Sequence, residues 1–173
     1  RLLPGMTPKP LLLLAVGNES RGDDALGPLL ARRVQAWLAS TGLDSQVEVI
    51  EEYQLQIEHT LDIMDRQLLL FVDAGQETMT PYTFYAARAA RLDGHTSHAL
   101  APETLLGVYA QVHQASPPPA FILCLAGTGF DLGEPLSAAA SLHLEQGFAF
   151  CRGLFEQPTP DFWSEQARMH HPS

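Results

Sequence analysis

Apolar residues fall into two alternating kinds of block along the chain, and these blocks predict strands separated by helices. Short continuous apolar runs are typical of buried strands, whereas apolar residues three and four positions apart indicate helices that bury one face. The predicted strands are Leu11–Val16, Val47–Glu51, Gln67–Val72, Thr83–Ala87 and Ala120–Ala126. The predicted helices are Leu26–Leu38, Leu55–Met64, Pro102–Gln114 and Ser137–Phe155. This alternation predicts an α/β fold with a largely parallel five-stranded sheet and helices on both faces.

The length and the composition indicate a single globular domain. The chain has 173 residues, of which 46% are hydrophobic and 17% are charged, and this balance argues against disorder. We expect the α/β domain to cover residues 11–156. Residues 1–10, in which Met6 is a candidate natural start, are expected to be a flexible segment. Residues 157–173 are expected to be a loosely ordered tail.

The net charge and the cysteine content narrow the range of partners and compartments. A formal net charge of -10 argues against nucleic acid and anionic membranes as partners. No apolar run is long enough to span a membrane, and the run Leu11–Leu14 is too short for the core of an export signal. Cys124 and Cys151 lack a metal-binding spacing. We therefore expect a cytoplasmic, reducing location. Because no segment offers an obvious apolar interface helix, we also expect a monomer.

The first candidate site is the loop that follows the first predicted strand. In an open α/β sheet, ligands bind beyond the carboxyl ends of the strands, and the acidic pair Asp23 and Asp24 suits a cation there better than a phosphate. Gly17 and Asn18 suit a sharp turn, and the loop lacks the glycine patterns of nucleotide sites. On this segment alone, the simpler interpretation is that one aspartate caps the following helix. The other aspartate then remains a candidate metal ligand.

Two further side chains are candidates for the same edge of the sheet. Asp73 follows a strongly apolar strand, and a carboxylate so near the core needs a partner or a metal, although the sequence Asp-Ala-Gly also suits a turn. His98 lies in a loop before the third helix, and one imidazole with two carboxylates makes an open three-ligand site. Five other histidines are weaker candidates because they fall in helices or in the tail: His59, His113, His143, His170 and His171.

The order of these motifs resembles that of the hydrogenase maturation endopeptidases, which trim the large-subunit precursor of nickel–iron hydrogenases. The resemblance is carried by VGNESRGDDALGP at Val16–Pro28, VDAG at Val72–Gly75, TSHALAPETLL at Thr96–Leu106 and LAGTGFDLGEPLS at Leu125–Ser137. It implies a three-layer α/β sandwich with a twisted, mostly parallel sheet. The chain departs from the family at two positions: Asp24 stands where glutamate is frequent, and Ala25 stands where many members have glycine.

The resemblance also implies a site and a reaction. By motif position, the metal-contacting and catalytic residues are Asp24, Asp73 and His98. The implied metal is nickel, supplied by the hydrogenase large-subunit precursor, and no tightly bound cofactor is expected. The implied enzyme is a peptidase that removes the C-terminal extension of this precursor. Asp24 can both cap the helix and contact the metal, and Asp23 is left to cap the helix or orient Asp24. With no Ser–His–Asp triad evident, metal-assisted hydrolysis is the chemistry that remains.

Two other functions stay open at this point. A metal-dependent hydrolase of small substrates would use the same three side chains with a permanently bound ion, and tight stoichiometric metal would favour it. A non-catalytic hydrogenase assembly or metal-binding module would bind the precursor without cutting it. A stable complex with an unchanged precursor mass would favour that second alternative.

Overall fold

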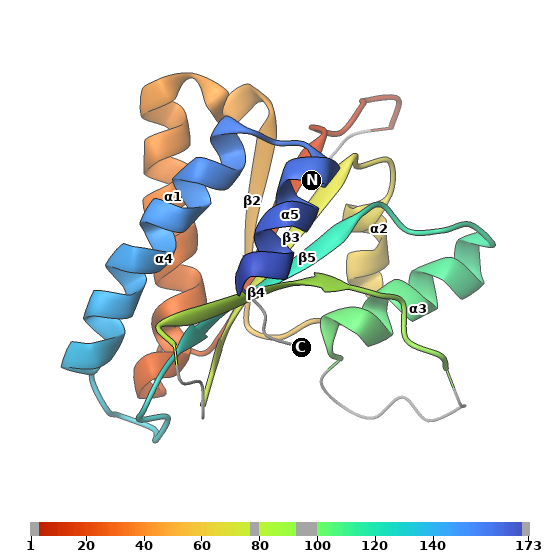
Figure 1. The fold of residues 1–173 in the computed structure, drawn as a ribbon. Coiled ribbons are helices and arrows are strands. Elements are labelled where there is room, and N and C mark those ends of the chain that lie inside the picture. Colours follow the sequence, from red (N-terminus) through yellow and green to blue (C-terminus); the bar gives the residue numbers. More distant parts are fainter. Residues whose placement is uncertain (1–3, 77–79, 93–99, 171–173) are drawn as a thin grey trace.

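The computed structural model describes residues 4–76, 80–92 and 100–170, which form a sheet covered by helices (Figure 1). The strands are β1 (Leu11–Val16), β2 (Val47–Glu52), β3 (Leu68–Gly75), β4 (Tyr82–Ala87) and β5 (Ala120–Ala126). The helices are α1 (Leu26–Thr41), α2 (Thr60–Ile63), α3 (Pro102–His113), α4 (Ala138–Glu156) and α5 (Pro160–His170). Three short 3-10 turns are η1 (Gly22–Ala25), η2 (Leu43–Ser45) and η3 (Ile57–His59).

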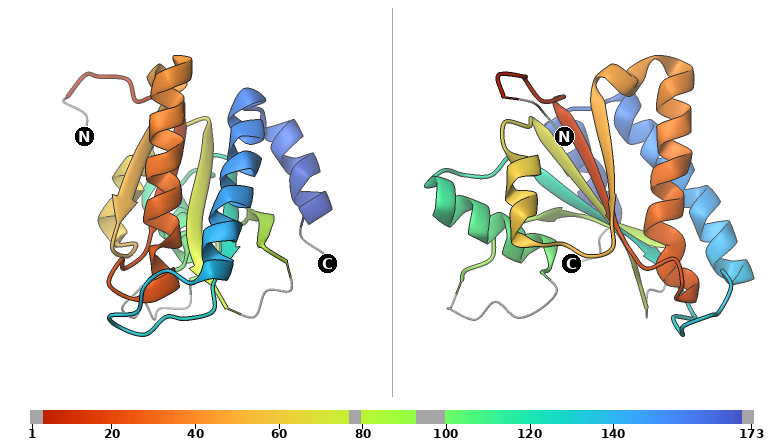
Figure 2. Two further views of the ribbon diagram at one scale, coloured as in Figure 1. Left: turned by 90° about the vertical axis from the view of Figure 1, so that its left-hand side faces the viewer. Right: turned by 180° about the vertical axis from the view of Figure 1, so that it is seen from behind.

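The five strands lie in the order β2-β1-β3-β5-β4. The first four strands of this order are mutually parallel, and β4 runs antiparallel to β5 at the edge. Helices α1, α4 and α5 cover one face of the sheet, and α2 and α3 cover the other (Figure 2). The predicted three-layer α/β sandwich with a mostly parallel five-stranded sheet is therefore confirmed.

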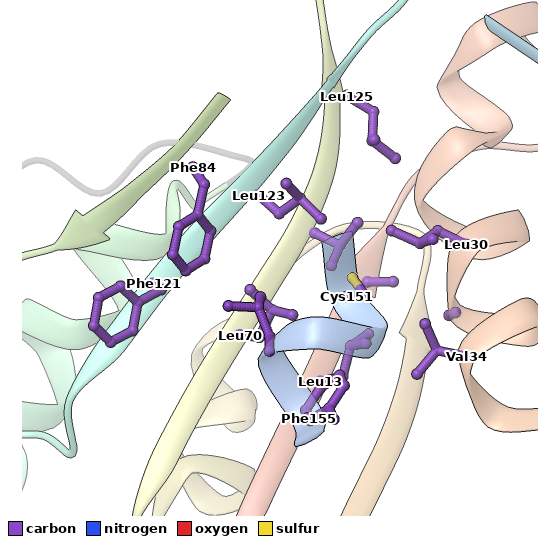
Figure 3. Packing of buried hydrophobic residues seen from close by; sticks show 14 of the residues in the cluster. Leu13, Leu30, Val34, Leu70, Phe84, Phe121, Leu123, Leu125, Cys151 and Phe155 are labelled. Atoms are coloured by element: carbon purple, nitrogen blue, oxygen red, sulfur yellow. The ribbon is translucent and has the colours of Figure 1, made fainter. Parts of the chain in front are cut away.

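Alternate residues of the strands face the two helical layers, so the sheet has a hydrophobic core on each side. Figure 3 shows side chains of the larger core, contributed by the sheet, α1 and α4: Leu13, Leu70, Phe84, Phe121, Leu123, Leu125, Leu30, Val34, Cys151 and Phe155. Leu12 and Leu14 of β1 belong to the second core, which they share with α2 and α3. Burial on both faces explains why β1 is apolar at successive positions.

Strand β3 continues beyond the end that its apolar run predicts. The segment Asp73–Gly75 pairs with Cys124–Ala126 of β5, so the chain does not turn at Asp-Ala-Gly. Asp73 continues the alternation of Leu69 and Phe71, whose side chains belong to the core under α2 and α3. The backbone on both sides of Asp73 is therefore fixed by the sheet.

Residues 160–170 form α5 instead of the loosely ordered tail that their composition predicts. Trp163 anchors this helix: its side chain is fully buried, and its Nε1 donates to the carbonyl oxygen of Leu154 at 2.9 Å. The indole ring contacts the rings of Phe84 and Phe121 at centroid distances of 6.3 and 5.6 Å. One large aromatic side chain thus attaches a mostly polar helix to the core.

The helix predicted over Leu55–Met64 is much shorter in the structure. Only η3 and the four-residue helix α2 form there, and Ile63 supplies a fully buried side chain. Within the described part of the chain, none of the helices combines the length and the apolar character that crossing a membrane requires.

Candidate functional site

Strands β1 and β3 lie side by side where the chain changes from one face of the sheet to the other. The connection from β1 to β2 passes through α1, whereas the connection from β2 to β3 passes through α2 on the opposite face. Open α/β sheets bind ligands at such a switch point, because the diverging connections leave a crevice beyond the carboxyl ends of the strands. Asp24 lies in the turn η1 after β1 and Asp73 lies near the end of β3, so two predicted site residues belong to this edge of the sheet.

The loop after β1 is folded around Asn18. The backbone N–H of Asn18 donates to Oδ2 of Asp24 at 2.7 Å, and its side-chain amide donates to the hydroxyl of Tyr53 at 2.8 Å. Its Oδ1 accepts from the backbone N–H of Ser20 at 2.9 Å. Gly17 leaves no room for a side chain, since a Cβ there would lie 2.1 Å from the carbonyl oxygen of Asp24. The Gly-Asn pair of the motif therefore holds the Asp24 carboxylate in place.

Neither aspartate of the loop caps α1, so the capping interpretation is wrong. Ala25 occupies the N-cap position of α1, and no side chain accepts a hydrogen bond there. The turn η1 runs directly into α1, so the start of the helix continues an existing turn. Asp23 and Asp24 are both directed to other partners.

Asp23 has hydrogen-bond partners that the sequence does not reveal. Its fully buried carboxylate accepts from the backbone N–H groups of Thr128 (2.7 Å), Gly129 (3.2 Å) and Ser137 (2.8 Å). The hydroxyls of Thr128 and Ser137 donate to it as well, at 3.3 and 2.7 Å. Burial alone would raise the pKa of Asp23, but the hydrogen bonds outweigh burial and lower the pKa to about 2. Asp23 is thus a charged link between the loop after β1 and the loop after β5.

Asp73 has the opposite electrostatic environment. Burial raises its pKa most strongly, a hydrogen bond of 2.7 Å from the Ala74 backbone N–H to Oδ1 lowers it, and the negative charge of Asp24 raises it further. The resulting pKa is about 6. Asp24 is therefore near enough for its charge to act on Asp73. A cation between the two would relieve both the desolvation and the repulsion.

Two other ionisable groups surround Asp73 on the same side of the sheet. Cys124 is its partner in register on β5, and burial, together with the charge of Asp73, raises the thiol pKa to about 11. Burial is also the main cause that raises the pKa of Tyr85 to about 12. Both groups are neutral near pH 7, so Cys124 is not an activated nucleophile. Of these three groups, Asp73 titrates closest to neutral pH.

The third predicted ligand, His98, lies outside the described residues. Across residues 4–76, 80–92 and 100–170, no three histidine, cysteine, aspartate or glutamate side chains are grouped for a metal ion. Two of the histidines treated as weaker candidates have partners. Nδ1 of His59 accepts from the Gln56 backbone at 2.8 Å, and Nδ1 of His143 lies 2.7 Å from the carbonyl oxygen of Ala126. The described part of the site therefore contains two of the three predicted ligands.

The sequence matches no family model and no curated protein, but solved structures match the fold. The NiFe hydrogenase maturation protease HycI from Thermococcus kodakarensis shares 18% identity at a TM-score of 0.63, over 86% of this chain and 94% of that one. The chain has the fold of the hydrogenase maturation proteases. The endopeptidase HybD from E. coli shares 16% identity at a TM-score of 0.60, over 84% and 92% of the two chains. The endopeptidase HycI from Escherichia coli shares 21% identity at a TM-score of 0.59, over 83% and 90%.

In this maturation-protease fold, the loop after β1 also borders a polar groove of about 410 Å³. The groove is lined by residues of that loop, of the start of α1 and of the end of β2: Gly17, Asn18, Glu19, Ser20, Pro28, Glu51, Glu52 and Tyr53. Beside it, Arg32 bridges Glu19 at 2.6 Å and Glu51 at 2.9 Å. Because Asn18 both lines the groove and donates to Asp24, the groove lies directly beside the Asp24 carboxylate.

Proposed function

We propose that the protein is an endopeptidase that removes the C-terminal extension of the nickel-loaded large-subunit precursor of a NiFe hydrogenase. The observation that carries the proposal is the meeting of Asp24 and Asp73 at the switch point of the sheet. Two further lines of support agree with the proposed activity. The sequence motifs point to these residues by their resemblance to the maturation endopeptidases, and the fold is that of the maturation proteases HycI and HybD.

The two carboxylates are prepared to receive a cation. Oδ2 of Asp24 is held by the Asn18 backbone and Oδ1 of Asp73 by the Ala74 backbone, so each side chain is fixed by one oxygen and can offer the other to a metal. We propose His98 as the third ligand. It precedes α3 closely in the sequence, and α3 covers the face of the sheet to which Asp73 belongs. Two carboxylates and one imidazole suit a divalent transition metal.

In this proposal the nickel ion belongs to the precursor and is part of the substrate. Its contact with Asp24, Asp73 and His98 fixes the scissile bond against the carboxyl edge of the sheet. With a pKa of about 6, Asp73 is ionised and ready for a cation at neutral pH. A metal placed there polarises a carbonyl group or lowers the pKa of an attacking water. The proposed enzyme acts in the cytoplasm as a monomer and holds no tightly bound cofactor of its own.

The test is the mass of a nickel-loaded large-subunit precursor after incubation with the protein. Asp24→Asn, Asp73→Asn and His98→Ala are compared with the wild type. Asp44→Asn is the matched control, because Asp44 is exposed and lies on η2, which precedes β2 and is not part of the site. We expect the wild type and the control to release a C-terminal peptide from the nickel-loaded precursor only. Each of the three site variants should leave the precursor mass unchanged.

An uncut precursor with the wild type, across several hydrogenase classes, would contradict the proposal. If the precursor still bound stably, the assembly-module alternative would take its place. Stoichiometric metal in the purified protein together with hydrolysis of small esters or phosphates would instead identify the small-substrate hydrolase.

A further inference from the structure

Two loops at the carboxyl edge of the sheet are fastened to each other. The loop after β1 (residues 17–25) and the loop after β5 (residues 127–137) are here called the clamped loops. The backbone N–H of Asp23 donates to the carbonyl oxygen of Gly129 at 2.7 Å. A Cβ at Gly22 would lie 2.5 Å from the same oxygen, so the two backbones are in direct contact.

The Asp23 carboxylate is the centre of this junction. Its two oxygens accept five hydrogen bonds from Thr128, Gly129 and Ser137, all of which belong to the second clamped loop. Asp24 is the next residue of the same 3-10 turn. Because Asp23 and Asp24 are consecutive residues of one 3-10 turn, the anchoring of Asp23 also holds the backbone that carries Asp24.

We propose that Asp23 is a positioning residue: its clamped carboxylate holds Asp24 in the orientation that contacts the metal of the precursor. The inference rests on the proposed function, because the orientation of Asp24 matters only if Asp24 binds that metal. A buried charge gives little net stability compared with an apolar residue, whereas a fully hydrogen-bonded one fixes geometry. Metal and catalytic sites depend on such supporting residues, because small displacements of a ligand are costly.

The decisive variant is Asp23→Asn, which keeps the size of the side chain but presents an amide NH2 to hydrogen-bond donors. The matched control is Val34→Ala. Val34 is a fully buried residue of α1 outside the clamped loops, so its truncation destabilises the fold without touching the junction. Both proteins are assayed at a temperature at which circular dichroism shows them folded. We expect Asp23→Asn to lower kcat roughly a hundredfold, the scale of a ~1 Å misplacement, and Val34→Ala to change it less than about threefold.

A second measurement separates positioning from general stability. The affinity for nickel-loaded precursor is compared with the affinity for nickel-free precursor. We expect the wild type and Val34→Ala to prefer the loaded form by at least roughly tenfold, about 1.4 kcal/mol. Asp23→Asn should lose this preference, as Asp24→Asn does, because a misdirected Asp24 no longer reaches the metal.

A milder pair of variants covers the case in which Asp23→Asn does not fold. Ser137→Ala removes one hydroxyl bond to Asp23 and the N-cap of α4, in which Ser137 Oγ accepts from Ala140 N at 3.1 Å. Thr159→Ala removes a comparable bond, because Thr159 Oγ1 accepts from Phe162 N at 3.1 Å at the start of α5. The two variants lose similar helix caps, but only Ser137→Ala weakens the junction. We expect kcat to fall about tenfold in Ser137→Ala and to stay within about twofold in Thr159→Ala.

The inference is overturned if folded Asp23→Asn keeps both kcat within about threefold and the preference for nickel-loaded precursor, or if Ser137→Ala and Thr159→Ala behave alike. These results differ from a failure of the proposed function. If the proposed function fails, the wild type itself neither cuts the precursor nor prefers the nickel-loaded form, and Asp24→Asn changes neither result.

Discussion

The amino and carboxyl edges of the sheet differ in how their buried charges are compensated. At the amino edge, the buried guanidinium of Arg66 contacts Glu48 and donates to the carbonyl oxygens of Asp62 and Lys9, each at 2.8 Å. At the carboxyl edge, the partly buried carboxylate of Asp73 meets the like charge of Asp24. The positive charge of Arg66 is compensated by its partners. The negative charge of Asp73 is instead destabilised by burial and by the negative charge of Asp24.

This difference suggests a structural role for the charge of Arg66 and a ligand-binding role for the pair Asp24 and Asp73. A compensated buried charge fixes the geometry of the edge where it lies and needs nothing further. Two like charges in one place cost folding free energy, so they persist where a ligand completes the site. The turn η1 contains one carboxylate of each kind. The charge of Asp23 is compensated by five hydrogen bonds, whereas the charge of its neighbour Asp24 raises the pKa of Asp73.

The largest effect is expected from Asp73→Asn, which removes the uncompensated charge. Cleavage of the precursor should fall by at least roughly a thousandfold, or about 4 kcal/mol in the barrier. Stability at pH 7 should rise by about 2 kcal/mol, because a folded-state pKa of about 6 lies above the unfolded value, and ionisation therefore opposes folding at neutral pH. Cleavage assays and urea unfolding test the two parts. A loss of stability in this variant would contradict the comparison of the two edges.

The next largest effect is expected at the compensated edge. Arg66→Met removes a buried cation and leaves Glu48 without this partner, so stability should fall by about 3 kcal/mol. Under conditions in which the variant is folded, it should still cleave the precursor at the wild-type rate. Urea unfolding measures the loss. A loss below about 1 kcal/mol would mean that the amino edge does not depend on this charge.

A smaller effect concerns acid unfolding. The pKa of Asp23 is about 2 in the folded protein and near 4 in the unfolded chain, so ionised Asp23 stabilises the fold above pH 4. That contribution, about 2 kcal/mol, should be lost as the pH falls from about 4 to about 2. Asp23→Asn should lack this part of the pH dependence. Urea unfolding at a series of pH values gives the slopes, and equal slopes for both proteins would speak against the buried link.

The smallest effect is the direct influence of one site carboxylate on the other. In Asp24→Asn the pKa of Asp73 should fall below its present value of about 6, because a negative charge that raises it is gone. Burial, the larger cause, stays, so the pKa should remain above the ordinary range of an aspartate. Carbon NMR of the Asp73 carboxyl group measures the shift. An unchanged pKa would mean that the two groups do not act on each other.

The sheet could be predicted from the sequence because its strands carry local patterns, whereas the end of β3 could not. The sequence Asp73–Gly75 is a local turn signal, but pairing with β5 overrides it. Helix α5 was missed for a related reason. Its pattern is mostly polar, and its stability comes from Trp163, whose partners Phe84 and Phe121 are far away in the sequence.

The candidate site remains a prediction, and the sequence suggests it through residues that come after apolar runs. Asp24 lies in the loop after one apolar run and Asp73 comes directly after another, and their motifs carry the family resemblance. The sequence leaves Asp23 either to cap the helix or to orient Asp24, and capping is the usual local use of an aspartate before a helix. Its actual partners, Thr128 and Ser137, are 105 and 114 residues away, and nothing in the neighbouring sequence announces them.

The long reach of Asp23 also sets the moment at which the site takes shape during translation. Ribosomes add roughly 5–20 residues per second, so about 5–20 s separate the synthesis of Asp23 from that of Ser137. Throughout this interval the loop that carries Asp24 lacks the hydrogen bonds between Asp23 and the loop after β5. Asp23 gains its five hydrogen bonds only after β5 and the loop behind it have been made, so the link between the two clamped loops is a late step of chain synthesis.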